Sequence, residues 1–198
     1  MKNELYAEGE EKFGWLGSRF FEITRAIPTL RKFYAFVLND VTTYDFGSVL
    51  DIGSGTGFML LSIAGAKENF SGLGIDPSSQ MVARAIRKSK KVDLQNRISF
   101  MTGSSRSIPG GSKFDLIYST LSFHHWKDGE DSIRNIMERL NPGAHFVIYE
   151  VTDDGSFNKR FVRSHLMSRQ KFEEISNRLN LAVDIKEENG YLRANFKK

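Results

Sequence analysis

The chain has 198 residues, 40% of them hydrophobic and 26% charged, with a formal net charge of +4. This length accommodates a sizeable core and predicts a single domain over residues 1–198. No apolar run approaches the roughly 20 residues needed to cross a bilayer. The charged stretch Met1–Lys12 lacks the apolar core of a signal peptide, so we expect a cytoplasmic protein without a membrane span. The absence of cysteine excludes disulfides and thiolate metal sites.

Residues 1–45 precede the first expected sheet strand and predict a helical N-terminal cap on a core of residues 46–198. Gly17–Ala26 and Thr29–Asn39 both favour helices, and together they carry too many apolar side chains to leave in water. Such a cap would help to close a substrate pocket. The predicted pocket wall is Phe13, Trp15 and Phe20, with plain core packing as the alternative for each.

A glycine-rich turn follows the first predicted strand. Val49, Leu50 and Ile52 form a short apolar run typical of a buried parallel strand, and Phe58–Ala66 favours a helix. Between them, glycines at 53, 55 and 57 let the backbone turn sharply and approach a ligand. A dinucleotide fingerprint would need its third glycine at position 58, where Phe58 stands instead. We expect a ligand site at the carboxyl end of this strand.

A second predicted strand, Phe70–Asp76, ends in a carboxylate about 20 residues after the glycine turn. In nucleotide-binding α/β folds an acidic residue at this position accepts hydrogen bonds from the ribose hydroxyls. The alternative is an acidic N-cap for the helix beginning at Pro77, and the two roles are compatible.

The rest of the chain continues the alternation of strands and helices. Further strands are predicted at Ile98–Met101, Phe114–Ser119 and His145–Glu150, with helices over 128–140 and 168–180. Asn141-Pro142-Gly143 is expected to end the first of these helices. Leu181–Lys186 and Tyr191–Phe196 predict a hairpin, because Asn189-Gly190 is a strong turn signal.

Three segments carry a family resemblance over about residues 47–150. They are the G-x-G-x-G turn with Asp51 before it, the run Ser119–Trp126 (Ser-Thr-Leu-Ser-Phe-His-His-Trp), and Leu-x-Pro-Gly-x-x-x-x-Ile-x-Glu over 140–150. In this order they resemble the class I S-adenosylmethionine-dependent methyltransferases, with the ubiquinone and menaquinone biosynthesis enzymes as the nearest comparison. The resemblance implies an α/β fold: a Rossmann-like, seven-stranded, mostly parallel sheet with an antiparallel C-terminal hairpin and helices on both faces.

The resemblance also implies the cofactor, S-adenosyl-L-methionine, and the product S-adenosyl-L-homocysteine. The methionine part would lie on the first strand and turn, the ribose on the second strand, and the adenine beyond it. The residues concerned are Asp51, Gly53, Ser54, Gly55 and Gly57; Asp76 and Pro77; and Met81, Gly103, Ser104 and Ser105, with Ser119 near the sulfonium. Relatives usually have an aspartate where this chain has Ser104, so the charge-assisted bond to the adenine amino group is absent here. Met81 has plain core packing as its alternative.

The segment after the fourth predicted strand is expected to face the methyl acceptor. Phe123 and Trp126 are predicted to bind it, and His124 or His125 would serve as a general base if the acceptor must lose a proton near pH 7. The alternative is that one histidine starts a helix and the other forms part of the pocket wall. Two adjacent histidines face different ways, so we expect no metal site.

The expected partner is a small-molecule acceptor, with oligomeric state open between monomer and homodimer. One alternative is a regulatory or partner protein that binds the cofactor without chemistry. Another is a protein or nucleic-acid methyltransferase. The cations between Arg84 and Arg97 favour a solvated helix end over a nucleic-acid patch.

Overall fold

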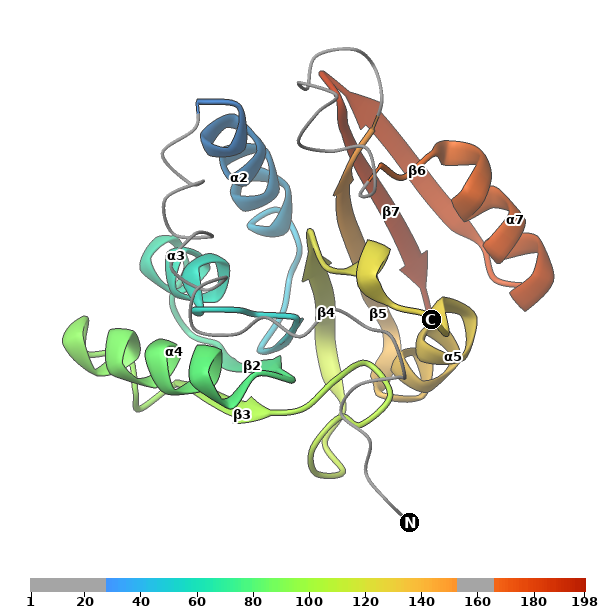
Figure 1. Ribbon diagram of the computed structural model, residues 1–198. Helices are drawn as coiled ribbons and strands as arrows, with labels where there is room; N and C mark the ends of the chain where they lie inside the picture. Colours follow the sequence, from blue (N-terminus) through green and yellow to red (C-terminus); the bar gives the residue numbers. More distant parts are fainter. Residues whose placement is uncertain (1–27, 153–165) are drawn as a thin grey trace.

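The computed structural model describes residues 28–152 and 166–198, which form a seven-stranded sheet with helices packed on both sides (Figure 1). The predicted helix Gly17–Ala26 and the predicted wall residues Phe13, Trp15 and Phe20 lie outside the described residues. The strand order is β3-β2-β1-β4-β5-β7-β6.

The first five strands run parallel and the last two complete the sheet as an antiparallel hairpin. The parallel strands are β1 (Ser48–Ile52), β2 (Ser71–Asp76), β3 (Ile98–Thr102), β4 (Phe114–Thr120) and β5 (Leu140–Val151). The hairpin consists of β6 (Val183–Glu188) and β7 (Tyr191–Lys197), and β7 pairs with both β5 and β6. Asn189 and Gly190 both have positive φ, as a two-residue hairpin turn requires. The predicted fold class is confirmed.

Two apolar clusters, one on each face of the sheet, hold the helices. Helices α2 (Pro28–Val41), α3 (Phe58–Ala66) and α4 (Ser79–Lys91) contribute Phe33, Leu60 and Ala85 to one cluster. Helices α5 (Gly129–Glu138) and α7 (Arg169–Leu179) contribute Ile133, Ile136 and Phe172 to the other. All six side chains are fully buried. None of the described helices is long and apolar enough to cross a membrane.

The boundary between α5 and β5 differs from the prediction. The helix ends at Glu138 and the strand begins at Leu140, five residues before the predicted start at His145. Pro142 and Gly143 suggested a break between helix and strand, but both residues lie within β5. The pairing of β4 with β5 shifts register between Phe114 and Leu116, and this irregularity accommodates the two residues in the strand.

The strand order reverses at β1. Strands β2 and β3 lie on one side of β1, and the chain then crosses over so that β4 and β5 lie on its other side. In open α/β sheets the crevice at such a reversal, outside the carboxyl ends of the strands, is where ligands bind. The connection from β3 to β4, residues 103–113, contains no helix, so a tight loop borders this crevice.

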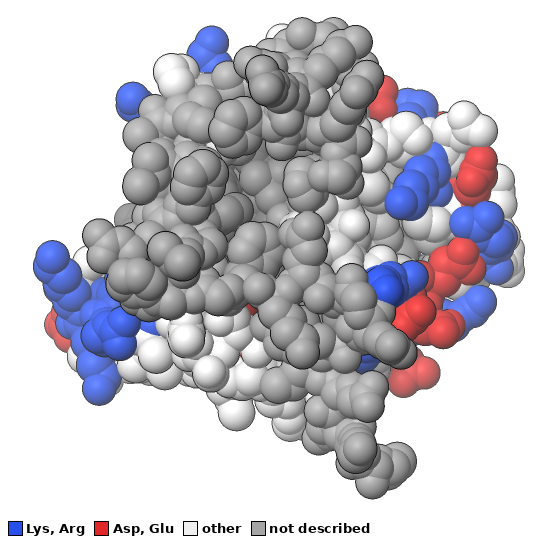
Figure 2. Space-filling model, viewed as in Figure 1, with Lys and Arg blue, Asp and Glu red and all other residues white. Residues whose placement is uncertain are grey.

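Lys and Arg side chains gather at one end of the molecule, at the lower left of Figure 2, over the carboxyl end of α4. The last turn of this helix carries Lys88, Lys90 and Lys91, which the helix dipole favours. Lys88 Nζ also donates to Thr56 Oγ1 at 3.0 Å, so this helix supports the glycine turn.

Candidate active site

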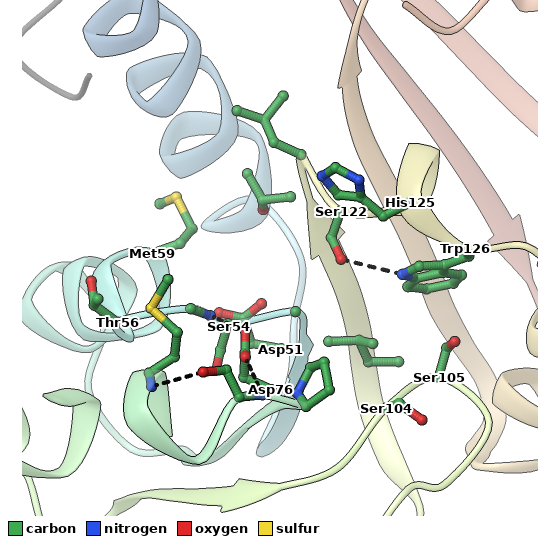
Figure 3. Close-up of a pocket in the computed structure, with 18 of the residues that line it drawn as sticks. Asp51, Ser54, Thr56, Met59, Asp76, Ser104, Ser105, Ser122, His125 and Trp126 are labelled. Atoms are coloured by element: carbon green, nitrogen blue, oxygen red, sulfur yellow. Dashed lines mark hydrogen bonds between the residues drawn. The ribbon is translucent and has the colours of Figure 1, made fainter. Parts of the chain in front are cut away.

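A cavity lies over the carboxyl ends of β1, β2 and β4, at the reversal of strand order (Figure 3). Its empty space, the open mouth included, is about 1140 Å³. Eleven residues predicted from the sequence line it: Asp51, Gly53, Ser54, Gly55, Asp76, Pro77, Met81, Ser104, Ser105, His125 and Trp126.

The glycine turn forms one side of the cavity, and its backbone approaches the site closely at Gly53 and Gly55. Gly53, Gly55 and Gly57 have φ of 76°, 52° and 74°, which L side chains rarely adopt. The amides of Gly53 and Ser54 both donate to Ile75 O at 2.9 Å, which holds the turn against β2. A Cβ on Gly53 would lie 2.2 Å from Ser122 Oγ, so the segment after β4 closes tightly on the turn.

Asp76, at the tip of β2, accepts hydrogen bonds from two backbone amides. Its Oδ2 accepts from Gly55 N at 2.9 Å and its Oδ1 from Ser78 N at 2.8 Å. Burial raises the pKa of Asp76 to about 6, against the opposing effect of these two bonds. A carboxylate oxygen has two lone pairs, so each can still accept a ligand hydroxyl, and together they match a vicinal diol.

Asp51, near the end of β1, is 1% exposed, and its Oδ2 has no hydrogen-bond partner among the described residues. Burial raises its pKa to about 7; the charge of Asp76 raises it further, and the hydroxyl of Tyr118 on β4 acts in the opposite direction. The buried hydroxyl oxygens of Ser54, Ser104 and Thr120 also have no partner within the described ranges. Unpaired buried polar atoms are costly, so this cavity is built for a polar ligand with hydrogen-bond donors.

The loop after β3 forms the wall beyond Asp76. Gly103 N donates to Asp76 O at 3.2 Å, and Ser104 and Ser107 exchange backbone hydrogen bonds of 3.1 and 3.0 Å. The Ser105 hydroxyl lies 2.9 Å from Ser132 Oγ on α5, so it is already paired. Of the two serines of this loop that line the cavity, Ser104 is therefore the one whose hydroxyl is buried without a partner among the described residues.

The segment after β4 forms the opposite wall and is held at several points. Leu121 has φ of 49°, an uncommon conformation for a residue with a bulky side chain, and its amide donates to Tyr149 O at 2.9 Å. The Trp126 indole Nε1 donates to Ser122 Oγ at 3.2 Å, as Figure 3 shows. His125 lies between them and lines the cavity.

His124 has a different environment from His125. It belongs to the short 3-10 turn η1 (Phe123–His125), and its Nδ1 lies 2.8 Å from Glu150 Oε2, a fully buried carboxylate on β5. The backbone amide of His124 donates to the other oxygen of Glu150 at 3.3 Å. This pair anchors η1 to the sheet, and His124 does not line the cavity.

Four further predicted residues also lie outside the cavity lining: Gly57, Gly103, Ser119 and Phe123. A Cβ on Gly57 would meet Phe100 at 2.5 Å, and one on Gly103 would meet Pro109 at 2.8 Å, so both glycines permit close packing. Ser119 is fully buried in β4. Phe123 packs on Trp126 and Phe172, with ring centroids 5.1 and 5.3 Å apart.

The structure also brings residues to the cavity that sequence reasoning missed. These are Tyr34, Ile52, Thr56, Phe58, Met59, Ser78, Arg106, Thr120, Leu121 and Ser122. Three of them, Ile52, Thr56 and Ser122, lie within the motifs noted in the sequence, so their position in those motifs could have predicted their place in the cavity. Tyr34 is on α2 and reaches the site only through packing, its ring 5.1 Å from that of Phe58. Among the described residues no group of three His, Cys, Asp or Glu could hold a metal.

Comparisons with known proteins agree on the family. A methyltransferase domain model matches residues 49–143. An uncharacterised methyltransferase of Bacillus mycoides is 30% identical over 167 residues, covering 80% of this chain and 76% of that protein. The chain belongs to the methyltransferase family.

Solved structures give the same fold. A proposed S-adenosylmethionine-dependent methyltransferase of Methanococcus maripaludis is similar with a TM-score of 0.79 and 21% identity, covering 98% of this chain and 97% of that one. The plantazolicin methyltransferase BamL, solved with S-adenosylhomocysteine, gives a TM-score of 0.72 at 14% identity over 91% and 89% of the two chains. The protein is a class I methyltransferase, and S-adenosylmethionine is its cofactor.

Proposed function

We propose that this protein transfers a methyl group from S-adenosylmethionine to a small-molecule acceptor. The observation that carries the proposal is the pairing of Asp51 and Asp76 in one cavity, both buried enough to have raised pKa values. A donor with cationic ammonium and sulfonium groups and a ribose diol would satisfy both carboxylates. When bound, the donor supplies an electrophilic methyl group, so the protein has mainly to align a nucleophile with it.

The strand order supports one direction for the donor. With its diol on Asp76 at β2 and its charged amino-acid part on Asp51 and the glycine turn at β1, the base would extend toward β3. In this proposed arrangement the adenine lies between Pro77 or Met81 and the loop at Ser104, and the methyl group lies toward β4. Each of these residues lines the cavity.

The wall formed by Leu121, Ser122, His125 and Trp126 is our candidate for the acceptor side. Since His124 is occupied by Glu150, His125 is the histidine we assign to removing the acceptor's proton. BamL, which has the same fold, was solved in complex with a triazolic desmethyl plantazolicin analogue and S-adenosylhomocysteine, and this supports a place for an acceptor beside the cofactor. The single-domain organisation, the cytoplasmic location and the narrower likeness to the quinone-biosynthesis enzymes stay predictions.

Cofactor binding tests the first half of the proposal. Asp76→Ala removes both acceptors for the diol, and hydrogen bonds to a charged group are worth about 1.5–3 kcal/mol each, so the affinity for S-adenosylhomocysteine should fall about 100-fold or more. Isothermal calorimetry measures this, with the exposed Asp45→Ala as the matched control. An unchanged affinity of the Asp76 variant would overturn the ribose assignment.

Turnover tests the second half. Donor labelled in its methyl group is incubated with the wild-type chain and a panel of phenols, amines, thiols and carbon acids. His125→Gln should lower the rate about 100-fold for an acceptor that loses a proton, whereas His145→Gln, on β5 outside the cavity lining, should not. Cofactor binding without any turnover would favour a non-catalytic binding protein. Label transferred only to protein or nucleic acid would favour a macromolecular acceptor.

A further inference from the structure

The wall of the cavity beyond Asp76 presents a hydroxyl where a base-recognising carboxylate would be expected. Ser104 lines the cavity, is 9% exposed, and its Oγ is buried without a partner in the part of the chain described. Its backbone is fixed by the two hydrogen bonds with Ser107 and by the packing of Gly103 on Pro109. The position of Ser104 is therefore set, while its hydroxyl remains free to rotate.

Arg106, which lines the same wall, adds a guanidinium donor, and its Nη1 lies 3.5 Å from Asp128 Oδ2, outside the cavity lining. Among the described residues that line the cavity, the only acids are Asp51 and Asp76, and both belong to strands β1 and β2 and not to the loop that carries Ser104. Figure 3 shows Ser104 and Ser105 together on the far side of the cavity from Thr56 and Met59.

The chemistry of these groups decides which purine edge they accept. An ionised carboxylate only accepts hydrogen bonds, so it selects the 6-amino group of adenine and repels the 6-oxo group of hypoxanthine. A hydroxyl accepts from the adenine amino group or donates to N1, and it equally donates to O6 or accepts from N1–H of hypoxanthine. A guanidinium only donates, which favours the oxo group further.

We propose that Ser104 gives this enzyme a relaxed base specificity, so that its nucleoside site accepts 6-oxo as well as 6-amino purines. The ligand class is S-nucleosyl-homocysteine, and the deaminated member is S-inosyl-homocysteine. The inference rests on the proposed function, because the direction of the donor across β1, β2 and β3 places the base at Ser104.

The experiment compares the affinities of the protein for two ligands and does not depend on methyl transfer. Isothermal calorimetry at pH 8 measures S-adenosyl-L-homocysteine and S-inosyl-L-homocysteine against the wild-type chain, Ser104→Asp and Ser107→Asp. The wild type should bind the two within about fivefold of one another. In Ser104→Asp the affinity for the adenosyl compound should exceed that for the inosyl compound by roughly 50-fold or more. Ser107→Asp adds the same charge to the same loop outside the cavity lining and should keep the wild-type ratio.

The outcomes separate this inference from the proposed function. If the wild type binds the adenosyl ligand but the inosyl ligand roughly 50-fold more weakly, the base specificity is not relaxed and the inference is wrong. An unchanged ratio in a folded Ser104→Asp variant, as judged by thermal melting, would show that Ser104 does not face the base. If that variant does not fold, the ratio of the two affinities in the wild type alone decides whether the base specificity is relaxed. Failure of the wild type to bind either ligand would overturn the proposed function itself.

Discussion

Single residues in this protein are placed for a ligand at some expense to the ligand-free fold. Asp51 is the clearest example, because a fully buried carboxyl with one unpartnered oxygen destabilises its own ionised form. Asp76 differs, since two backbone amides support its charge. The Asp76 carboxylate is therefore already held by two backbone amides, whereas Oδ2 of Asp51 is left for a ligand to pair.

The raised pKa of Asp51 makes stability depend on pH. The unfolded chain ionises this carboxyl near pH 4, whereas the folded protein keeps its proton up to about pH 7. The folded state thus binds the extra proton in this window, so the free energy of unfolding falls as pH rises from about 4 through 7, by at most roughly 4 kcal/mol. Asp51→Asn should remove this contribution and leave the smaller one of Asp76, whose pKa is also raised, so the variant should melt above the wild type at pH 8, with no advantage near pH 4.

Thermal melting of the ligand-free proteins across this pH range measures the effect. The exposed Asp93→Asn is the matched control and should follow the wild type throughout. A parallel course of the Asp51→Asn and wild-type curves would show that Asp51 does not titrate in the window.

At the scale of elements, the site depends on two turns that press on each other. The glycine turn after β1 and the segment Leu121–Trp126 after β4 meet where Gly53 faces Ser122. The His124–Glu150 pair and the hydrogen bond from Trp126 to Ser122 hold the second turn in place. Each turn limits the movement of the other, so the cavity is largely formed before a ligand arrives.

Gly53→Ala tests this contact. Any residue but glycine is strained at positive φ, at about 1 kcal/mol, and Gly110→Ala should show that strain alone because its φ is 71° and nothing lies within 4 Å. Gly53→Ala should lose about 2 kcal/mol more, because its Cβ would overlap Ser122. Urea denaturation compares the two, and equal losses would mean that the second turn moves aside freely.

The elements themselves could largely be predicted, because their signals are local. The run from Val49 to Gly57 and the Asn189-Gly190 turn specify a strand end and a hairpin without reference to the rest of the chain. The site could be predicted only where a motif defines it, as with Asp51 and Asp76. The burial of His124 depends on Glu150, 26 residues later in the chain, and no pattern in the sequence distinguishes it from His125.

At the scale of the whole molecule, a polar network joins helix α2 to the sheet. The Tyr149 hydroxyl on β5 donates to Asp40 Oδ2 on α2 at 2.7 Å. Arg193 on β7 lies 3.6 Å from the same carboxyl and 3.3 Å from the Tyr44 hydroxyl. Burial and the nearby Asp40 raise the pKa of Tyr44 to about 12, so its hydroxyl stays neutral while it accepts from Arg193 Nη1. Since α2 also carries Tyr34 to the cavity, this network links the sheet to the site.

Tyr149→Phe should reduce the free energy of unfolding by about 1 kcal/mol, because it leaves a partly buried carboxyl oxygen with one donor fewer. A double-mutant cycle with Asp40→Asn isolates the pair, and we expect a coupling of about 1 kcal/mol from chemical denaturation. Additive effects of the two substitutions would show that packing, and not this hydrogen bond, holds α2.

The position of β7 has a consequence for how the protein is made. Tyr191–Lys197 is inserted between β5 and β6, so the edge of β5 has no partner until these residues leave the ribosome. Synthesis proceeds at about 5–20 residues per second, so the nascent chain carries an open strand edge during the interval between the synthesis of β5 and that of β7. An unpaired edge of this kind invites association between chains. Biosynthesis therefore exposes this enzyme to aggregation, and to chaperone capture, in the interval before β7 pairs with β5.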